Sequence, residues 1–354
     1  MREKFFERFS WVSLVLNSFR IIVIILIVVG AFNTLQGGKY TTSQWVSLSV
    51  SGLAQGSIYA LIALGYTLVY GILLMINFAH GEVFMAGAFT AVFVAEAFKE
   101  SGFLDSSPLL AVTILILVAA VVSTVVAVIL ERVAYRPLRG APRLVPLITA
   151  IGASFFLQYT FRGLYGSGFK SYPEVAAVQG TWHIAGNDIP IVQIVVFVAA
   201  ILLMVALYWL VERTKVGKAM RAVSENKEVA ALMGIDIDQI IVMTFAIGGA
   251  LAGAAGVING LYRPQGVSFT MGFFPGIKAF TAAVLGGIGN IPGAMLGGLF
   301  LGVFESIGPN LILEGLGIPA ANQLKDAIAF TMLVLVLIFR PQGILGERLT
   351  EKKA

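Results

Sequence analysis

Residues 56–89 read GSIYALIALGYTLVYGILLMINFAHGEVFMAGAF, two apolar runs separated by a short polar turn. The first run extends over residues 44–76 and the second over residues 79–98. A membrane-spanning helix needs about 20 apolar residues, so each run is long enough to cross a bilayer. A helix over the whole first run would reach about 50 Å, which is more than one straight span requires. We therefore expect a broken or strongly tilted helix there.

The composition of the chain agrees with a membrane location. Of its 354 residues, 58% are hydrophobic and only 12% are charged. Soluble domains carry about 25% charged residues, so this chain has too few polar groups to cover a water-facing surface of its size. Helices satisfy their own backbone hydrogen bonds in lipid. The sequence thus predicts an all-α, polytopic transmembrane helical bundle with broken glycine-rich helices.

The distribution of basic residues predicts the topology. They concentrate in the N-terminus, in residues 131–143 and 212–239, and in the C-terminal tail. Such loops lie on the cytoplasmic side of membrane proteins, and the pattern is not that of a nucleic-acid-binding surface. We expect about ten spans, with eight to ten compatible with the shortest runs, and both termini in the cytoplasm. The apolar runs are 11–32, 44–76, 79–98, 109–130, 144–161, 189–211, 240–262, 276–290, 293–313 and 324–339.

Glycine is the second organising feature, with 39 residues. Pairs spaced four apart, Gly249/Gly253 and Gly293/Gly297, allow two helices to approach closely in lipid. The cluster GNIPG at 289–293 is expected to end one helix and begin the next. It is either a cytoplasmic turn or a re-entrant break that lines a cavity.

The most polar internal stretch, residues 212–239, contains a predicted short helix around 224–234. Asn226 or Ser224 can cap its start, and Gly234 is placed to end it. Asp236 is expected to cap the helix that follows. A short amphipathic helix of this kind either lies on the lipid surface or docks into a groove of a partner protein.

This stretch carries a resemblance to a known family. Glu228-x-Ala230-x-x-x-Gly234 is similar to the EAA–x3–G loop of ABC-importer permeases, although the chain reads Glu-Val-Ala. Four further stretches resemble the branched-chain amino acid permease of the LivH type. They are GSIYALIALGYTLVYGILLMINFAHGEVFMAGAF (56–89), ERVAYRPLRG (131–140), GIKAFTAAVLGGIGNIPGAMLGGLFLG (276–302) and RPQGILGER (340–348).

The resemblance implies a domain organisation and a set of coupling residues. Residues 1–43 form an N-terminal extension with the first span, 44–340 the permease domain, and 341–354 a cytoplasmic tail. In the family the EAA loop forms a coupling helix that docks on the ATPase subunit. The residues that this role implies here are Glu225, Glu228, Ala230, Ala231, Leu232 and Gly234.

The resemblance also implies function and partners. The chain would be the permease subunit of an ATP-binding-cassette importer in a prokaryotic plasma (inner) membrane. It would translocate branched-chain or related hydrophobic amino acids delivered by an extracytoplasmic substrate-binding protein. Two separate ATPase subunits and a second, LivM-like permease subunit are implied as partners, and no cofactor. Because the chain has no G-x-x-x-x-G-K-[ST] motif, it has no P-loop and no ATPase activity by that route.

Two alternatives to this function remain open. Permeases for urea, short amides or simple sugars share much of this architecture. A secondary transporter driven by an ion gradient would also contain broken glycine-rich helices, but the loop of the coupling type and the scarcity of buried acids argue against it.

His80 and Glu82 are the residues that first suggest a catalytic or metal-binding site. A zinc site needs at least three protein ligands, and the only other histidine, His183, falls in the predicted external loop 162–188 and is expected to be solvated. No catalytic or metal site is therefore expected. One interpretation is a turn in which Asn77 and His80 bond exposed backbone groups and Glu82 stabilises the next helix N-terminus.

The other interpretation of this turn is a permeation path or gate. Candidates for that role elsewhere in the chain are Gly289, Asn290, Pro292 and Glu305. We expect Glu305 to form an interior ion pair, because a charge at the bilayer centre is costly. Lys278 is expected near the outer end of its span, where its ammonium would reach the interface.

Overall fold

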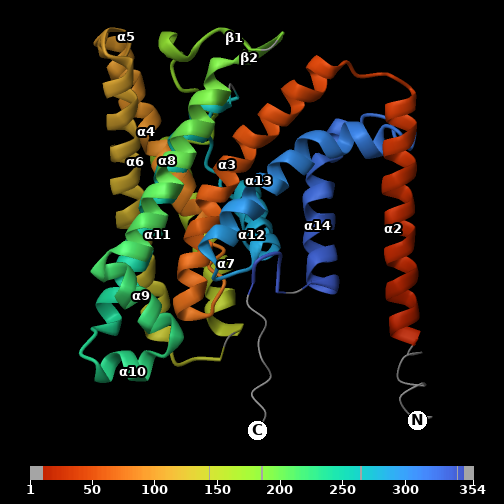
Figure 1. Cartoon of the computed structure of the whole chain (residues 1–354). Coiled ribbons are helices and arrows are strands. Elements are labelled where there is room, and N and C mark those ends of the chain that lie inside the picture. Colours follow the sequence, from red (N-terminus) through yellow and green to blue (C-terminus); the bar gives the residue numbers. More distant parts are fainter. Residues whose placement is uncertain (1–10, 143, 185, 264, 341, 347–354) are drawn as a thin grey trace, which may run out of the picture.

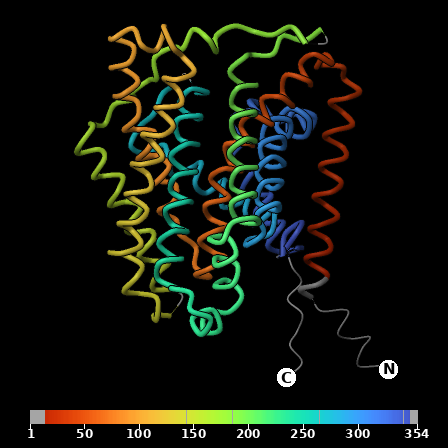
Figure 2. The backbone as a smooth tube through the Cα atoms, turned by 60° about the vertical axis from the view of Figure 1, so that its left-hand side comes forward, coloured from red at the N-terminus to blue at the C-terminus, as the bar shows by residue number. Residues whose placement is uncertain are grey.

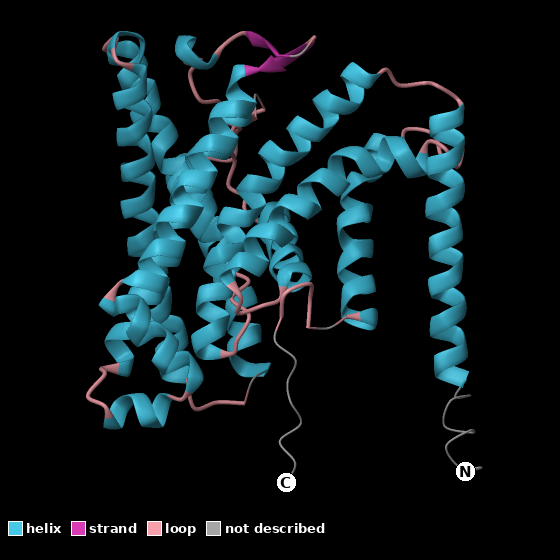
Figure 3. Ribbon diagram, viewed as in Figure 1, coloured by secondary structure: helices cyan, strands magenta, loops and turns pink. Residues whose placement is uncertain are grey.

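The computed structural model describes residues 11–346 except residues 143, 185, 264 and 341, and its fold is a helical bundle (Figures 1 and 3). The predicted basic N-terminus and most of the predicted tail lie outside the described residues. The long helices are α2 (Trp11–Gln36), α3 (Thr42–Leu73), α4 (His80–Glu100), α6 (Pro108–Leu130), α7 (Leu144–Tyr165), α8 (Ile191–Arg213), α11 (Ile237–Tyr262), α12 (Phe273–Gly286), α13 (Ile291–Gly308) and α14 (Lys325–Phe339).

Shorter elements connect the long helices. They are α5 (Phe103–Ser106), η2 (Glu131–Tyr135, a π-helix), η3 (Arg136–Leu138), η4 (Ala176–Val178), β1 (Thr181–Ile184), β2 (Asn187–Pro190), α9 (Lys215–Glu225), α10 (Lys227–Leu232), η5 (Pro309–Leu313) and η6 (Ala321–Leu324).

Nine helices among the described residues are long and apolar enough to cross a membrane, and α12 is a shorter apolar helix. The long helices and α12 coincide with the ten apolar runs of the sequence. α12 reaches its place through the segment 265–272, which starts among the external loops, where Val267 pairs with Lys170. This segment then enters the bundle, since Val267 and Ser268 are buried. The nine long helices fall within the predicted range of eight to ten spans, and α12 with its lead-in accounts for the remaining apolar run.

The helix α3 is one continuous helix of 32 residues. The alternative of a broken helix is therefore wrong, and Figure 1 shows α3 running obliquely through the bundle. Thr41 and Gln44 form a capping box at its start, and the helix ends where Leu74 adopts a left-handed conformation. The oblique path accommodates a helix that is longer than a straight span.

Glycines bring the central helices together, as predicted. A Cβ at Gly56 of α3 would lie 2.8 Å from the carbonyl oxygen of Gly298 on α13. A Cβ at Gly249 of α11 would lie 2.8 Å from the carbonyl oxygen of Ser123 on α6. Because real Cβ atoms do not approach so closely, these contacts require glycine, and backbones pack directly on each other. By contrast, α2 and α14 are peripheral and largely exposed.

The two ends of the bundle differ (Figures 1 and 2). At one end lie α5 and the antiparallel hairpin β1–β2, and most of the hairpin falls within the predicted external loop 162–188. His183 sits there with an exposed side chain, and its Nδ1 lies 2.8 Å from Asp188 Oδ1. At the opposite end lie α9, α10, the first described residues of α2 and the last turn of α14. This second end carries the basic loops and is the cytoplasmic face.

Candidate functional site

The coupling loop, our name for residues 212–239, folds into the two short helices α9 and α10. α10 begins after Asn226, whose Oδ1 accepts hydrogen bonds from two backbone N–H groups of the first turn at 3.0 and 3.1 Å. Ser224, the other candidate for this cap, instead donates to the carbonyl oxygen of Arg221 at 2.8 Å, within α9. The structure thus contains a break at Asn226, and the predicted helix around 224–234 is shorter than expected.

The end of α10 follows the prediction. Gly234 has a φ of +82°, a conformation that glycine adopts without strain. Its N–H donates to the carbonyl of Ala231 at 2.9 Å, and the next N–H donates to the carbonyl of Ala230 at 3.1 Å. Asp236 Oδ1 then accepts the backbone N–H three residues later at 3.0 Å and caps α11. Tight caps at both ends fix the direction of α10.

The outer face of α10 is apolar and exposed. Val229 is 54% exposed, Leu232 is 87% exposed and Met233 is 78% exposed. Of the six residues expected to couple to an ATPase, only Ala230 is buried; Glu225, Glu228, Ala231, Leu232 and Gly234 are at the surface. We call the exposed side chains of Val229, Leu232 and Met233 the apolar knob. Ala230, on the opposite side, packs against the rest of the protein.

An ion cluster ties this loop to the cytoplasmic end of α6. Arg139 bonds to both Glu131 and Asp238, and Arg136 also bonds to Asp238, at the start of α11. The Glu131 side chain is fully buried. Burial and the nearby positive charge of Arg139 lower the pKa of Lys227, the first residue of α10. Lys227, at the start of α10, thus lies within the electrostatic influence of Arg139.

The π-helix η2 links this cluster to the polar turn after α3. Tyr135 is its last residue, and its hydroxyl donates a 2.6 Å hydrogen bond to Asn77 Oδ1. Both side chains are buried. π-helical segments occur frequently at functional sites, and this one holds the turn to the cytoplasmic cluster.

The turn predicted before the second apolar run precedes α4, and the side chains of His80 and Glu82 are buried there. Glu82 Oε1 accepts hydrogen bonds from Ser154 Oγ at 3.1 Å and Gln158 Nε2 at 2.7 Å, both on α7. Ala79, which precedes α4, makes no side-chain cap. Glu82 does lie in the first turn of α4, as expected. Its carboxylate faces the start of α12, where a Cβ on Gly272 would lie 2.9 Å from Oε2.

Glu305 forms the predicted interior ion pair. Lys278 Nζ donates to Glu305 Oε1 at 2.7 Å and to Asp326 Oδ1 at 2.6 Å, and it lies 3.3 Å from the hydroxyl of Tyr59. The expectation that Lys278 reaches the interface is therefore wrong, since its side chain is 4% exposed. Two acids from α13 and α14 hold the ammonium inside the bundle.

The cluster GNIPG separates α12 from α13, as predicted. Asn290 Oδ1 accepts the N–H of Gly293 at 2.8 Å and caps α13, with Pro292 in the first turn. Asn290 Nδ2 donates to the carbonyl of Leu345 at 2.9 Å. Gly289 has a φ of +93°. The candidate path residues therefore fall in three places: around Glu82, around Glu305, and in this cytoplasmic connection.

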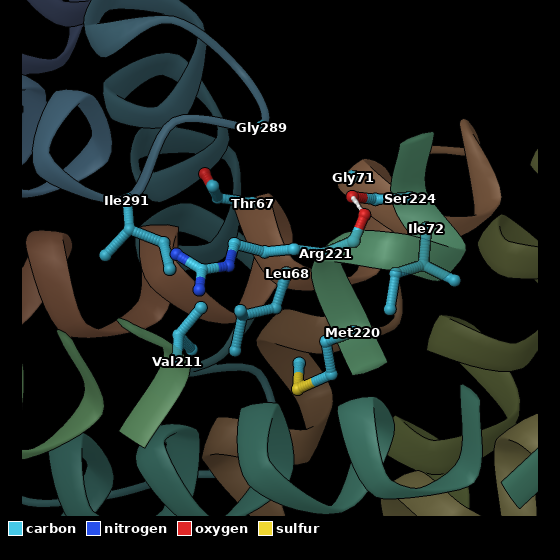
Figure 4. A pocket seen from close by; sticks show the side chains of 10 residues that line it. All are labelled: Thr67, Leu68, Gly71, Ile72, Val211, Met220, Arg221, Ser224, Gly289 and Ile291. Carbon is cyan, nitrogen blue, oxygen red and sulfur yellow. Dashed lines mark hydrogen bonds between the residues drawn. The ribbon is translucent and has the colours of Figure 1, made fainter. Parts of the chain in front are cut away.

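A hollow lies between this connection and the coupling loop (Figure 4). Its walls come from the last turns of α3, the end of α8, α9 and the residues Gly289 and Ile291. The guanidinium of Arg221 extends across it. The local sequence does not indicate the roles of Arg221, Tyr135 and Glu131, because only the folded chain brings Asn77 to Tyr135, buries Glu131 and places Arg221 across the hollow.

The amino-acid sequence of the chain is similar to those of known transport proteins. The family described as "Branched-chain amino acid transport system / permease component" matches residues 48–337. The chain belongs to this family. The match begins after α2, so the permease carries one span outside the family's matched range.

Individual relatives cover most of the permease. BraD of Pseudomonas aeruginosa, a high-affinity branched-chain amino acid transport system permease protein, is 46% identical over 306 residues, which is 86% of this chain and 96% of BraD. LivH of Escherichia coli, which carries the same description, is 41% identical over 85% of this chain and 96% of LivH. The ribose import permease RbsC of Haemophilus influenzae is 23% identical over 72% of this chain and 75% of RbsC. The permease is thus a transport subunit and not an enzyme.

Proposed function

We propose that this permease is the membrane-spanning subunit of an ATP-driven importer in a prokaryotic plasma membrane. It translocates branched-chain amino acids that an extracytoplasmic binding protein delivers. The identities of 46% and 41% to BraD and LivH, against 23% to a ribose permease, support amino acids over sugars as cargo. Residues 44–340 form the permease domain, and residues 1–43 are an addition to it.

The observation that carries the ATP-driven mechanism is the apolar knob of α10. Leu232 and Met233 are exposed beside the half-exposed Val229, and grouped exposed apolar side chains mark protein–protein or membrane interaction sites. Its position at the cytoplasmic face favours a protein partner, and two separate ATPase subunits are the partners that the function requires. A second, LivM-like permease subunit completes the translocation unit.

The route from the ATPases to the translocation path runs through a chain of neighbouring residues. A push on α10 acts on the cluster around Arg139 and Glu131, because Asp238 in the coupling loop binds Arg136 and Arg139. Tyr135 passes the displacement to Asn77, and Asn77 precedes the buried groups of α4. In this mechanism Asn77, His80 and Glu82 belong to the gate, while Glu305 holds α12, α13 and α14 in one unit.

Purification and reconstitution test the proposal. The permease is expected to co-purify with ATP-binding subunits, and uptake of leucine into proteoliposomes is expected to require ATP and to survive collapse of the proton gradient. Uptake that follows the proton gradient and persists without ATP would show a secondary transporter instead. Uptake of ribose or urea in preference to leucine would identify the other cargo classes.

A glycine substitution tests the role of α10. Gly234→Val is expected to abolish coupling between ATP hydrolysis and uptake, because a φ of +82° strains a β-branched residue. Membrane insertion is expected to remain intact, since nothing surrounds the Cβ position. Gly140→Val is the matched control: it also lies in an open cytoplasmic loop, with an ordinary φ. Unchanged transport in Gly234→Val would count against docking through α10.

A further inference from the structure

The hollow at the cytoplasmic face has the lining of an aliphatic site. Its apolar wall residues come from α3, α8, α9 and the start of α13: Leu68, Ile72, Val211, Met220 and Ile291. Gly71 and Gly289 form a further wall without side chains. Ligand sites typically combine such an apolar wall with a few polar groups that fix orientation.

The size of the hollow suits a small branched side chain. Its volume is about 60 Å³. This is several times the roughly 10–15 Å³ that a single water-sized group needs, so the hollow has room for a small aliphatic side chain.

Two polar groups border the same space. Arg221 donates one bond to the Glu212 carboxylate and another to its backbone carbonyl. A guanidinium has five N–H donors in total, so three have no acceptor among the residues that the structure describes. Thr67 Oγ1 is buried and has no hydrogen-bond partner among the described residues. An amino acid with its side chain in the hollow would find a carboxylate partner in Arg221 and a hydroxyl partner in Thr67.

We infer that this hollow is a release site, in which a branched-chain amino acid rests on the cytoplasmic side before it leaves the permease. The inference rests on the proposed function. The side chain fills the space between α3 and α9, and Arg221 binds the carboxylate. Because α9 belongs to the coupling loop, movement of this loop changes the wall of the site.

Filling the hollow by one methyl group tests its role. Gly71→Ala fits the helix, because the nearest atom to the new Cβ is the Cα of Gly289 at 4.0 Å. Maximal turnover of leucine and of valine is measured in proteoliposomes that contain the complete importer and saturating binding protein. One methylene changes discrimination in an apolar site by about tenfold or more, so the leucine-to-valine ratio is expected to fall about tenfold. Gly152→Ala on α7, with an equally open Cβ position, is the control.

Direct binding tests the carboxylate partner. Radiolabelled leucine is titrated onto the permease complex in nanodiscs without the binding protein. We expect saturable binding that leucinol, which lacks the carboxylate, does not displace. Arg221→Gln is expected to weaken it at least tenfold, whereas Lys218→Gln, an exposed cation on the same helix, is expected to leave it unchanged.

The outcomes separate the two claims. Wild-type importer that takes up no leucine would refute the proposed function. If the wild-type importer does take up leucine, three results would refute the release site alone. They are absent leucine binding, equal effects of Arg221→Gln and Lys218→Gln, and an unchanged leucine-to-valine ratio in Gly71→Ala.

Discussion

Replacement of Leu232 and Met233 by serine is expected to weaken ATPase binding strongly. Complete burial of such a side chain contributes about 1.5–3 kcal/mol. Leu232 is 87% exposed and Met233 is 78% exposed in the free permease, so most of that contribution is still available for docking. Together the two side chains provide about 2.5–5 kcal/mol of binding free energy. The double variant is therefore expected to bind about two to three and a half orders of magnitude more weakly.

The assay is titration of the purified ATPase subunit onto the permease in nanodiscs. Because both side chains are exposed, the thermal stability of the free permease is expected to stay unchanged. Leu109→Ser is the control, since Leu109 is 83% exposed at the opposite end of the bundle. A loss of affinity below about threefold, or an equal loss in the control, would refute docking through the apolar knob.

Three further changes have definite expected outcomes. Glu305→Ala removes one acid from the buried lysine of α12 and is expected to destabilise the bundle by about 3–5 kcal/mol, measured by thermal unfolding in detergent. Tyr135→Phe and Asn77→Ala are expected to be non-additive in uptake per ATP hydrolysed, because each removes the same hydrogen bond; additive effects would exclude this link. The bond from Tyr40 to Glu314 raises the pKa of Tyr40 from 10.0 to about 12. The contribution of this bond to folding stability is complete below pH 10 and is lost as the pH rises through about 12. Ultraviolet titration of the wild type and of Tyr40→Phe is expected to differ by one tyrosine that ionises late.

The sequence predicts the helices well because each one carries its own signal. Apolar length, loop charge and caps are local properties, and the end of α10 at Gly234 and the cap at Asn290 follow from them directly. The continuity of α3 does not follow from local properties, because its apolar run contains several glycines. Only the tertiary contacts show that these glycines allow close helix packing and do not break the helix.

The polar groups are harder to predict because their partners are distant in sequence. The sequence predicts a partner for Glu305 but places Lys278 at the interface. Only the packing of α12 against α13 and α14 brings Lys278, Glu305 and Asp326 together. Likewise, the local sequence around Glu82 favours a helix cap, whereas the groups that bind it come from α7, more than 70 residues later.

The contact between α3 and α13 has a mechanical consequence. Gly56 stands near the middle of α3, with about 21 Å of helix toward its outer end and about 26 Å toward its cytoplasmic end, at 1.5 Å per residue. Backbones also meet at Gly52 and at Ala60, so this contact extends over more than two turns of α3. We therefore expect α3 and α13 to move as one unit, so that a displacement at the cytoplasmic end of α3 is carried to α13 as well.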